Sequence, residues 1–214
     1  MIIEEIKPSV FHIKFQTQYL LTSTFMRIQE YYESPFKTIR NQVFTCEDFM
    51  DLYASESGGF TYFTDWSGFN VPDNIVRKFD KQYKNIMIKK EARLFQTIKA
   101  NILYYDRRKF YIIATNSEIN DAKCIRHELA HAYYYLKPSY RNKMNDLNHQ
   151  NKWKKQWKIY LLDKGYCEDM IDDEIQAYCA TDNTWDFNSR FPITKGLYNY
   201  SKNYRDLFDE YINK

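Results

Sequence analysis

Apolar residues in the first part of the chain recur at the spacing of an amphipathic helix. The stretch Thr17–Glu33 carries them at every third or fourth position, namely Leu20, Leu21, Phe25, Ile28 and Tyr32. Residues Val10–Phe15 before it alternate in character, which predicts a short strand. The pattern therefore predicts a strand followed by a long helix. Ser34-Pro35 ends this helix, because the residue before a proline disfavours the helical conformation.

Two more helices are predicted before residue 101. Thr45 is a suitable N-cap for a helix through Ala54, and the acids Glu47 and Asp48 in its first turn complement the helix dipole. The glycines of Ser57-Gly58-Gly59 break the pattern, and an aromatic, turn-rich stretch follows over residues 60–72. Helical spacing then returns and predicts a second long helix over Asp80–Ala100.

The second half of the chain predicts a hairpin and then helices. Ile102–Tyr105 and Phe110–Ala114 have strand character and are joined by a short polar turn. Asn116 or Ser117 is expected to cap a helix that runs to Leu136, where Pro138 stops it. Further helical segments are expected at Asn148–Asp163, which Gly165 would end, at Glu168–Thr181 and at Tyr200–Ile212.

These elements predict an α+β fold that is mainly helical, with a small sheet packed against the helix that ends at Leu136. A length of 214 residues fits a single domain over residues 1–214. Within it we expect an N-terminal helical and aromatic part over about 1–100, a core over about 101–181 and a closing helix over about 200–212.

Composition narrows the class of protein. Aromatic residues make up 18% of the chain, so the core is expected to be rich in rings. The net charge of +3 does not by itself imply nucleic acid or an anionic membrane. The four cysteines form no CxxC pair, which indicates reduced thiols. Because residues 1–8 lack the features of a signal peptide and the apolar runs are too short to cross a bilayer, we expect a cytoplasmic protein.

The motif His127-Glu128-Leu129-Ala130-His131 is HExxH on a predicted helix. Residues four apart lie on one helix face, so both imidazoles can reach one metal ion. A glutamate beside the first histidine can deprotonate a metal-bound water. Zinc suits this chemistry because it lowers the pKa of that water towards ~7.

The helical wheel places the two histidines away from the apolar positions. The apolar stripe consists of Ala122, Ile125, Leu129, Ala132 and Leu136. His127 and His131 lie on roughly the opposite face, which predicts that they point into a cleft. The alternative is that they are surface histidines on an ordinary amphipathic helix.

A third protein ligand is expected, because catalytic zinc usually takes three and leaves one position for water. The remaining histidines, His12 and His149, have no suitable setting, which makes a downstream carboxylate the natural candidate. Glu174 lies at the edge of the apolar stripe of its helix, whereas Asp172 and Asp173 are expected to point towards solvent or the helix N-terminus. Glu174 is therefore the predicted ligand, with Asp173 next. The acids would otherwise serve only to complement the helix dipole.

HExxH on a helix that follows an edge strand, with Glu174-x-x-Ala177 on a later helix, resembles the gluzincin branch of the zincin metallopeptidases. The resemblance covers residues 110–180. It implies zinc held by His127, His131 and Glu174, with Glu128 as the general base. It also implies that the strand Phe110–Ala114 lies beside the active-site helix and pairs with an extended peptide.

The chain departs from the gluzincin pattern in two ways. The gap between His131 and Glu174 is long enough for a whole extra helix, and one residue of the pattern differs. Larger gluzincins carry an Asp four residues after the ligand Glu, and that Asp orients a histidine; here the position is Tyr178. A different partner is therefore needed to orient the histidine. The stretches over residues 29–35 and 65–72 resemble small intracellular and viral HExxH proteins.

The leading functional hypothesis is a zinc metallopeptidase that acts on a peptide or protein substrate, without a membrane partner. The alternative is a zincin-fold protein in which zinc is structural or a binding surface matters more than turnover. A weaker hypothesis concerns residues 152–158, where lysines alternate with Trp153 and Trp157 as in some nucleic-acid-binding segments. We favour instead a helix with core-facing Trp153, Trp157 and Tyr160 and solvent-facing lysines.

Overall fold

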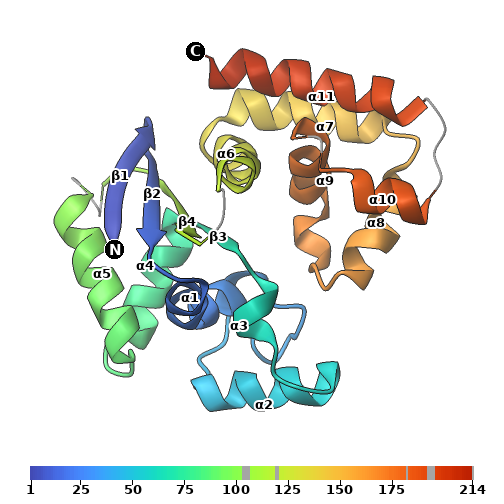
Figure 1. Cartoon of the computed structure of the whole chain (residues 1–214). Helices are drawn as coiled ribbons and strands as arrows, with labels where there is room; N and C mark the ends of the chain where they lie inside the picture. Colours follow the sequence, from blue (N-terminus) through green and yellow to red (C-terminus); the bar gives the residue numbers. More distant parts are fainter. Residues whose placement is uncertain (103–106, 119–120, 182, 192–195, 214) are drawn as a thin grey trace. The chain divides into compact units, whose positions relative to one another are not determined.

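The computed structural model describes residues 1–102, 107–118, 121–181, 183–191 and 196–213 (Figure 1). The chain divides into two compact units, Met1–Ile125 and Arg126–Lys214, and each is described by itself. Helices predominate in the described residues, and the strands there form one four-stranded mixed sheet. The predicted α+β class with a small sheet is therefore confirmed. Among the same residues, every helix is too short or too polar to cross a membrane.

The sheet belongs to the first unit and has the strand order β1-β2-β4-β3. Its strands are β1 (Ile2–Lys7), β2 (Val10–Phe15), β3 (Gly68–Pro72) and β4 (Tyr111–Asn116). β1 and β2 form an antiparallel hairpin, β2 and β4 run parallel, and β3 pairs with β4 antiparallel. The sequence predicted β2 but missed β1 and β3. β1 is largely exposed and rich in charge, and β3 lies inside the aromatic, turn-rich stretch.

β4 lies in the interior of the sheet, which corrects the expectation of an edge strand. It pairs with β2 on one side and with β3 on the other, and all its residues are buried. An extended peptide therefore has no free edge of β4 to pair with. Ile102 directly follows a helix instead of opening a strand. The rest of the predicted hairpin partner, residues 103–105, lies outside the described part of the chain.

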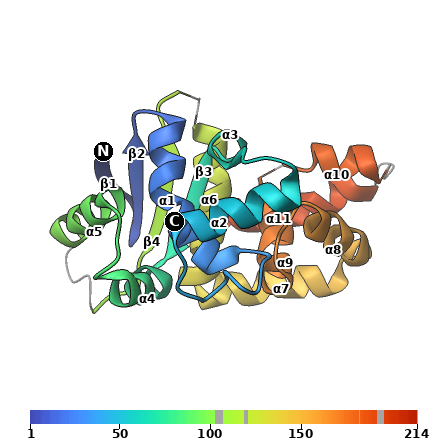
Figure 2. The ribbon, with the colours of Figure 1, turned by 90° about the horizontal axis from the view of Figure 1, so that it is seen from below.

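The first unit also contains α1 (Gln18–Glu33), α2 (Cys46–Ser57), α3 (Tyr62–Asp65), α4 (Asp73–Tyr83) and α5 (Lys89–Asn101). Figure 2 shows α1 running across the sheet, and it contacts β2, β3 and β4. Thr17 caps α1, and Thr45 caps α2 as predicted, in a reciprocal capping box with Asp48. α2 extends to Ser57, where Gly58 takes up a left-handed conformation and ends it.

The predicted long helix Asp80–Ala100 is wrong, because α4 ends at Tyr83 and α5 begins only at Lys89. Ile88 is extended, and its backbone N–H donates to the Glu91 carboxylate over 3.0 Å. Glu91 thus satisfies an amide at the first turn of α5 and starts a new helix. The partner that holds Glu91 in place is Arg27, far away in the sequence.

Arg27 is a buried cation that ties several segments of the first unit together. Its guanidinium forms two hydrogen bonds with the Glu91 carboxylate, one of them 2.8 Å from Nε to Oε1. It also donates to the carbonyl oxygens of Phe44 and Ile86, each over 3.1 Å. Both partners of the ion pair are almost fully buried, with side-chain exposures of 3% and 2%. The ion pair therefore joins α1 to α5 and to the segments that precede α2 and α5.

The second unit consists of helices. α6 (Ala122–Leu136) leads into it, followed by α7 (Pro138–Gln150), α8 (Lys154–Asp163), a 3-10 turn η1 (Glu168–Met170), α9 (Ile171–Ala180), α10 (Trp185–Arg190) and α11 (Gly196–Ile212). α9 and α11 agree with the predictions for Glu168–Thr181 and Tyr200–Ile212. The predicted helix Asn148–Asp163 is wrong, because α7 ends at Gln150 and α8 starts at Lys154. Pro138 begins α7 at a position where a proline needs no N–H partner.

The start of α6 also differs from the prediction. Asn116 is the last residue of β4, and its side-chain oxygen accepts from the Glu118 backbone N–H over 2.9 Å. Neither Asn116 nor Ser117 therefore caps α6, which begins at Ala122.

Aromatic rings fill the interior between α8, α9 and α10. Trp157 is fully buried and stacks on Phe187 at a centroid distance of 3.8 Å, while Tyr160 packs edge-on against both. Lys155 and Lys158 on the same helix are exposed. The alternation over residues 152–158 is thus mostly that of a core-facing helix, although Trp153 is only partly buried.

We expect the Arg27–Glu91 pair to contribute strongly to the stability of the first unit. Arg27→Met leaves the Glu91 carboxylate buried without its cation, which typically costs ~3–5 kcal/mol. Lys99→Met is the matched control, because Lys99 pairs with Asp80 near the surface and such pairs contribute ~0–1 kcal/mol. Denaturant unfolding measures both changes in the free energy of unfolding. Equal changes in the two variants would show that the buried pair does not hold this unit together.

Candidate metal centre

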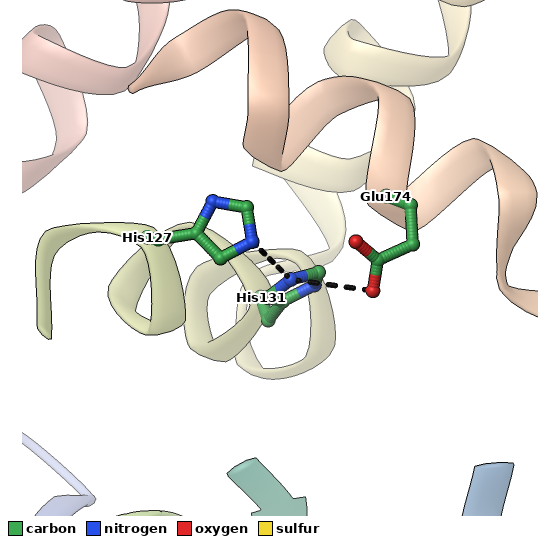
Figure 3. A group of neighbouring side chains, drawn as sticks. All are labelled: His127, His131 and Glu174. Atoms are coloured by element: carbon green, nitrogen blue, oxygen red, sulfur yellow. Dashed lines mark hydrogen bonds and ion pairs between the residues drawn. The ribbon is translucent and has the colours of Figure 1, made fainter. Parts of the chain in front are cut away.

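Two helices of the second unit bring together three side chains that could hold a metal ion. α6 carries His127 and His131 one turn apart, and α9 carries Glu174 (Figure 3). One ligand atom of each residue lies within 4.8 Å of the others. His131 Nε2 is 3.4 Å from His127 Nε2 and 3.6 Å from Glu174 Oε1. Tetrahedral zinc with bonds of ~2.0–2.1 Å places neighbouring donor atoms about 3.3 Å apart, so the two distances from His131 Nε2 are close to those that such an ion needs.

Asp173 sets the orientation of His131. Its Oδ1 lies 2.9 Å from His131 Nδ1, and a carboxylate accepts but does not donate, so Nδ1 carries the proton. A neutral His131 then presents the lone pair of Nε2 towards His127 and Glu174. The same Asp173 oxygen accepts from Gln176 Nε2 over 2.9 Å, and Gln176 Oε1 accepts from the Tyr140 hydroxyl over 2.8 Å. A chain of hydrogen bonds thus runs from Tyr140 of α7 to the His131 ring.

Thr181 sets the orientation of His127 in the same way. The Thr181 hydroxyl donates its single proton to the Ala177 carbonyl over 2.7 Å. It can therefore only accept in its 3.2 Å contact with His127 Nδ1, which makes that nitrogen the donor. The Tyr178 ring packs edge-on against His127 at a centroid distance of 5.0 Å. A neutral His127 also presents the lone pair of Nε2.

The electrostatics of the group suit a cation. Glu174 is 2% exposed, its Oε2 has no hydrogen-bond partner in the described structure, and burial raises its pKa to about 8 although the charge of His131 opposes this. Burial disfavours the charged form of His131, but the carboxylates of Asp173, Glu174 and Glu128 outweigh this and raise its pKa. Burial and the charge of His131 lower the pKa of His127 to about 3. A divalent cation would satisfy two facing lone pairs and an unpartnered carboxylate oxygen together.

The predicted site residues therefore come together, although their roles remain predictions. Glu128 is buried on the same helix, and its charge acts on both His131 and Glu174. The helical wheel was right about Leu129 and Ala132, which are buried, but Ala122 is exposed. His131 is only 2% exposed, so the ligand face of α6 lies against α9 rather than in an open cleft.

Sequence reasoning misplaced Asp173 and missed Thr181, Gln176 and Tyr140. Asp173 was expected to point towards solvent or the helix N-terminus, yet its side chain is 13% exposed and its Oδ1 lies 2.9 Å from His131 Nδ1. The available signal was the face of α9 that continues from Glu174 at positions i+4 and i+7, namely Tyr178 and Thr181, because both contact His127.

No protein-family model, curated protein or solved structure matches this chain.

We expect zinc binding to release at least one proton per ion at pH 7. The pKa values of His131 and Glu174 are both raised, so the metal-free pair holds protons at this pH that must leave before either group binds metal. Isothermal titration calorimetry in buffers of different ionisation enthalpy counts the protons. A count of zero with tight binding would mean that neither group is a ligand.

Glu174→Ala is expected to weaken zinc binding by more than the ~10–100-fold that is usual for residues one step removed from a metal. Asp172→Ala removes the same charge from the adjacent position, where the carboxylate is half exposed and paired with Lys154, and should leave the affinity nearly unchanged. Competition with a chromophoric chelator measures both. Equal affinities in the two variants would remove Glu174 from the ligand set.

Proposed function

We propose that this protein is a zinc-dependent metallopeptidase of the gluzincin kind, which hydrolyses a peptide bond in a peptide or protein substrate. The observation that carries the proposal is the convergence of His127, His131 and Glu174 on one point. Two of these residues come from an HExxH motif that also places Glu128 on the same helix.

The donor set supports zinc over the common hard cations. Two imidazole nitrogens and one carboxylate oxygen suit zinc, whereas magnesium and calcium prefer sites made of oxygen atoms. Three protein ligands also leave a fourth position for water or substrate, as in catalytic sites. Zinc held there supplies a Lewis acid that polarises a carbonyl group and lowers the pKa of water towards ~7.

The protein's own residues then divide the work. His127, His131 and Glu174 would hold the ion, and the burial of His131 and Glu174 would strengthen the electrostatic interactions in the site. Glu128 accepts a proton from the attacking water and passes it to the leaving amine, the role of a general acid–base group. A purely structural zinc site has no need of such a carboxylate.

A second candidate is a zincin-like protein in which the metal stabilises the fold or a partner-binding surface. The burial of His131 and Glu174, each 2% exposed, favours it, because a closed site gives a substrate little access. The presence of Glu128 favours the enzyme. The nucleic-acid hypothesis loses support, because the fully buried Trp157 has no face available for base stacking.

We expect Glu128→Gln to fold and bind zinc but to lose at least ~10²-fold in turnover, because the amide keeps the size of the side chain and removes the base. Cleavage of a random peptide library, read by mass spectrometry, first identifies substrates of the zinc-loaded protein. Glu168→Gln is the matched control, since Glu168 is exposed and pairs with Lys158.

Removal of zinc by a chelator should abolish cleavage, and added zinc should restore it. Cleavage at the wild-type rate by Glu128→Gln would contradict the mechanism. The structural candidate is favoured if neither the wild type nor the variant cleaves the library, although zinc binds to both and raises the melting temperature of both above that of the metal-free protein.

A further inference from the structure

We propose that α9 places the protons of both ligand histidines, with Asp173 acting on His131 and Thr181 acting on His127 as positioning residues. The inference rests on the zinc site proposed above. It adds that one helix supplies both a ligand and the groups that hold each ring with Nδ1 protonated and Nε2 available. No feature of the HExxH motif itself specifies these partners.

The arrangement matters because an imidazole binds metal only through a nitrogen that carries no proton. The hydrogen bond made by one ring nitrogen decides which tautomer is present and fixes the orientation of the ring. The two Nε2 atoms lie 3.4 Å apart, so both must be free of protons to face one ion. Nδ1 of each ring must then keep the proton, and each Nδ1 faces an acceptor on α9.

Asp173 is itself held in place from two directions. The Tyr140 hydroxyl donates to Gln176 Oε1, which turns the amide nitrogen of Gln176 towards Asp173. Tyr140 and Gln176 are both fully buried, so this amide cannot exchange its partners for water. Just before Asp173, the Asp172 carbonyl accepts from the buried Asn148 side chain over 2.8 Å, which anchors the start of α9 to α7.

The hydrogen bonds to the two histidines differ in strength. The contact between His131 and Asp173 involves a carboxylate and measures 2.9 Å, whereas the contact between His127 and Thr181 involves a neutral hydroxyl and measures 3.2 Å. Hydrogen bonds to an ionised acceptor are roughly twice as strong as neutral ones. The structure therefore assigns His131 as the more firmly held ligand and His127 as the weaker one.

Zinc affinity tests the two positions separately. Asp173→Ala should weaken binding by ~10–100-fold, and Asp173→Asn by less, because an amide oxygen can still accept from Nδ1. Thr181→Val should cause a smaller loss than Asp173→Ala, and Thr181→Ser should restore wild-type affinity. Asp172→Ala is the matched control for Asp173. Tyr140→Phe removes the hydroxyl that donates to Gln176 and should weaken zinc binding by less than ~10-fold. Tyr211→Phe is its control, because the Tyr211 hydroxyl donates to Ser139 instead.

Proton placement has a direct spectroscopic readout in the cobalt-loaded protein. The paramagnetic ion shifts the Nδ1–H signals of ligand histidines far outside the normal range. Wild type should show two such signals that disappear in heavy water. Asp173→Ala should broaden or remove the His131 signal alone, and Thr181→Val the His127 signal alone. A loss of folding would abolish both signals together, so the selective loss separates positioning from a general structural role.

The outcomes distinguish this inference from the function it rests on. Wild-type protein that binds neither zinc nor cobalt would overturn both. Tight binding by wild type, with Asp173→Ala no weaker than Asp172→Ala and with both shifted signals intact, would overturn the positioning role and leave the metal site standing. If Asp173→Ala fails to fold, the comparison of Asp173→Asn with Asp172→Asn by the same two measurements decides.

Discussion

The arrangement of the second unit depends on the cost of burying two imidazoles beside a carboxylate. Charged groups removed from water must be paired or must give up their charge, and polar atoms must find partners. His131 and Glu174 are each 2% exposed, and one oxygen of Glu174 has no partner in the described structure. Burial raises the pKa of Glu174 to about 8 and, together with the charge of His131, lowers the pKa of His127 to about 3. A cation at the meeting point would relieve this cost, so the folded state and metal binding are expected to favour each other.

α9 is the element through which this constraint reaches the rest of the unit. It carries the carboxylate and the acceptors for both rings. The remaining helices keep it in position: Asn148 of α7 binds its first turn and accepts in turn from the Tyr204 hydroxyl of α11 over 2.8 Å. Trp157 and Tyr160 of α8 pack against the Tyr178 ring, and Phe187 of α10 stacks on Trp157. Contacts with the other helices of the second unit thus hold α9 in place.

The parts of the site that follow from helix geometry alone could be predicted. Four-residue spacing fixes the relation of His127 to His131, and the edge of an apolar stripe selected Glu174. The role of Asp173 could not be predicted, because it depends on how α9 crosses α6 and on a glutamine held by a tyrosine more than thirty residues away in the sequence. The break between α4 and α5 was hidden for a similar reason, since the Glu91 cap is stabilised by Arg27, 64 residues earlier. β4 was placed at an edge because β3, its neighbour on the side away from β2, carries little strand pattern of its own.

The interior position of β4 also has a consequence for how the first unit forms. β1 and β2 are adjacent in the chain and can pair early, but the next strand in the sheet joins β2 only through contacts such as His12 with Thr115, 103 residues apart. Closing so long a loop carries an entropic cost before any strand pairing repays it, and topologies of this kind fold slowly. During synthesis one edge of β2 therefore stays unpaired until β4 has been made.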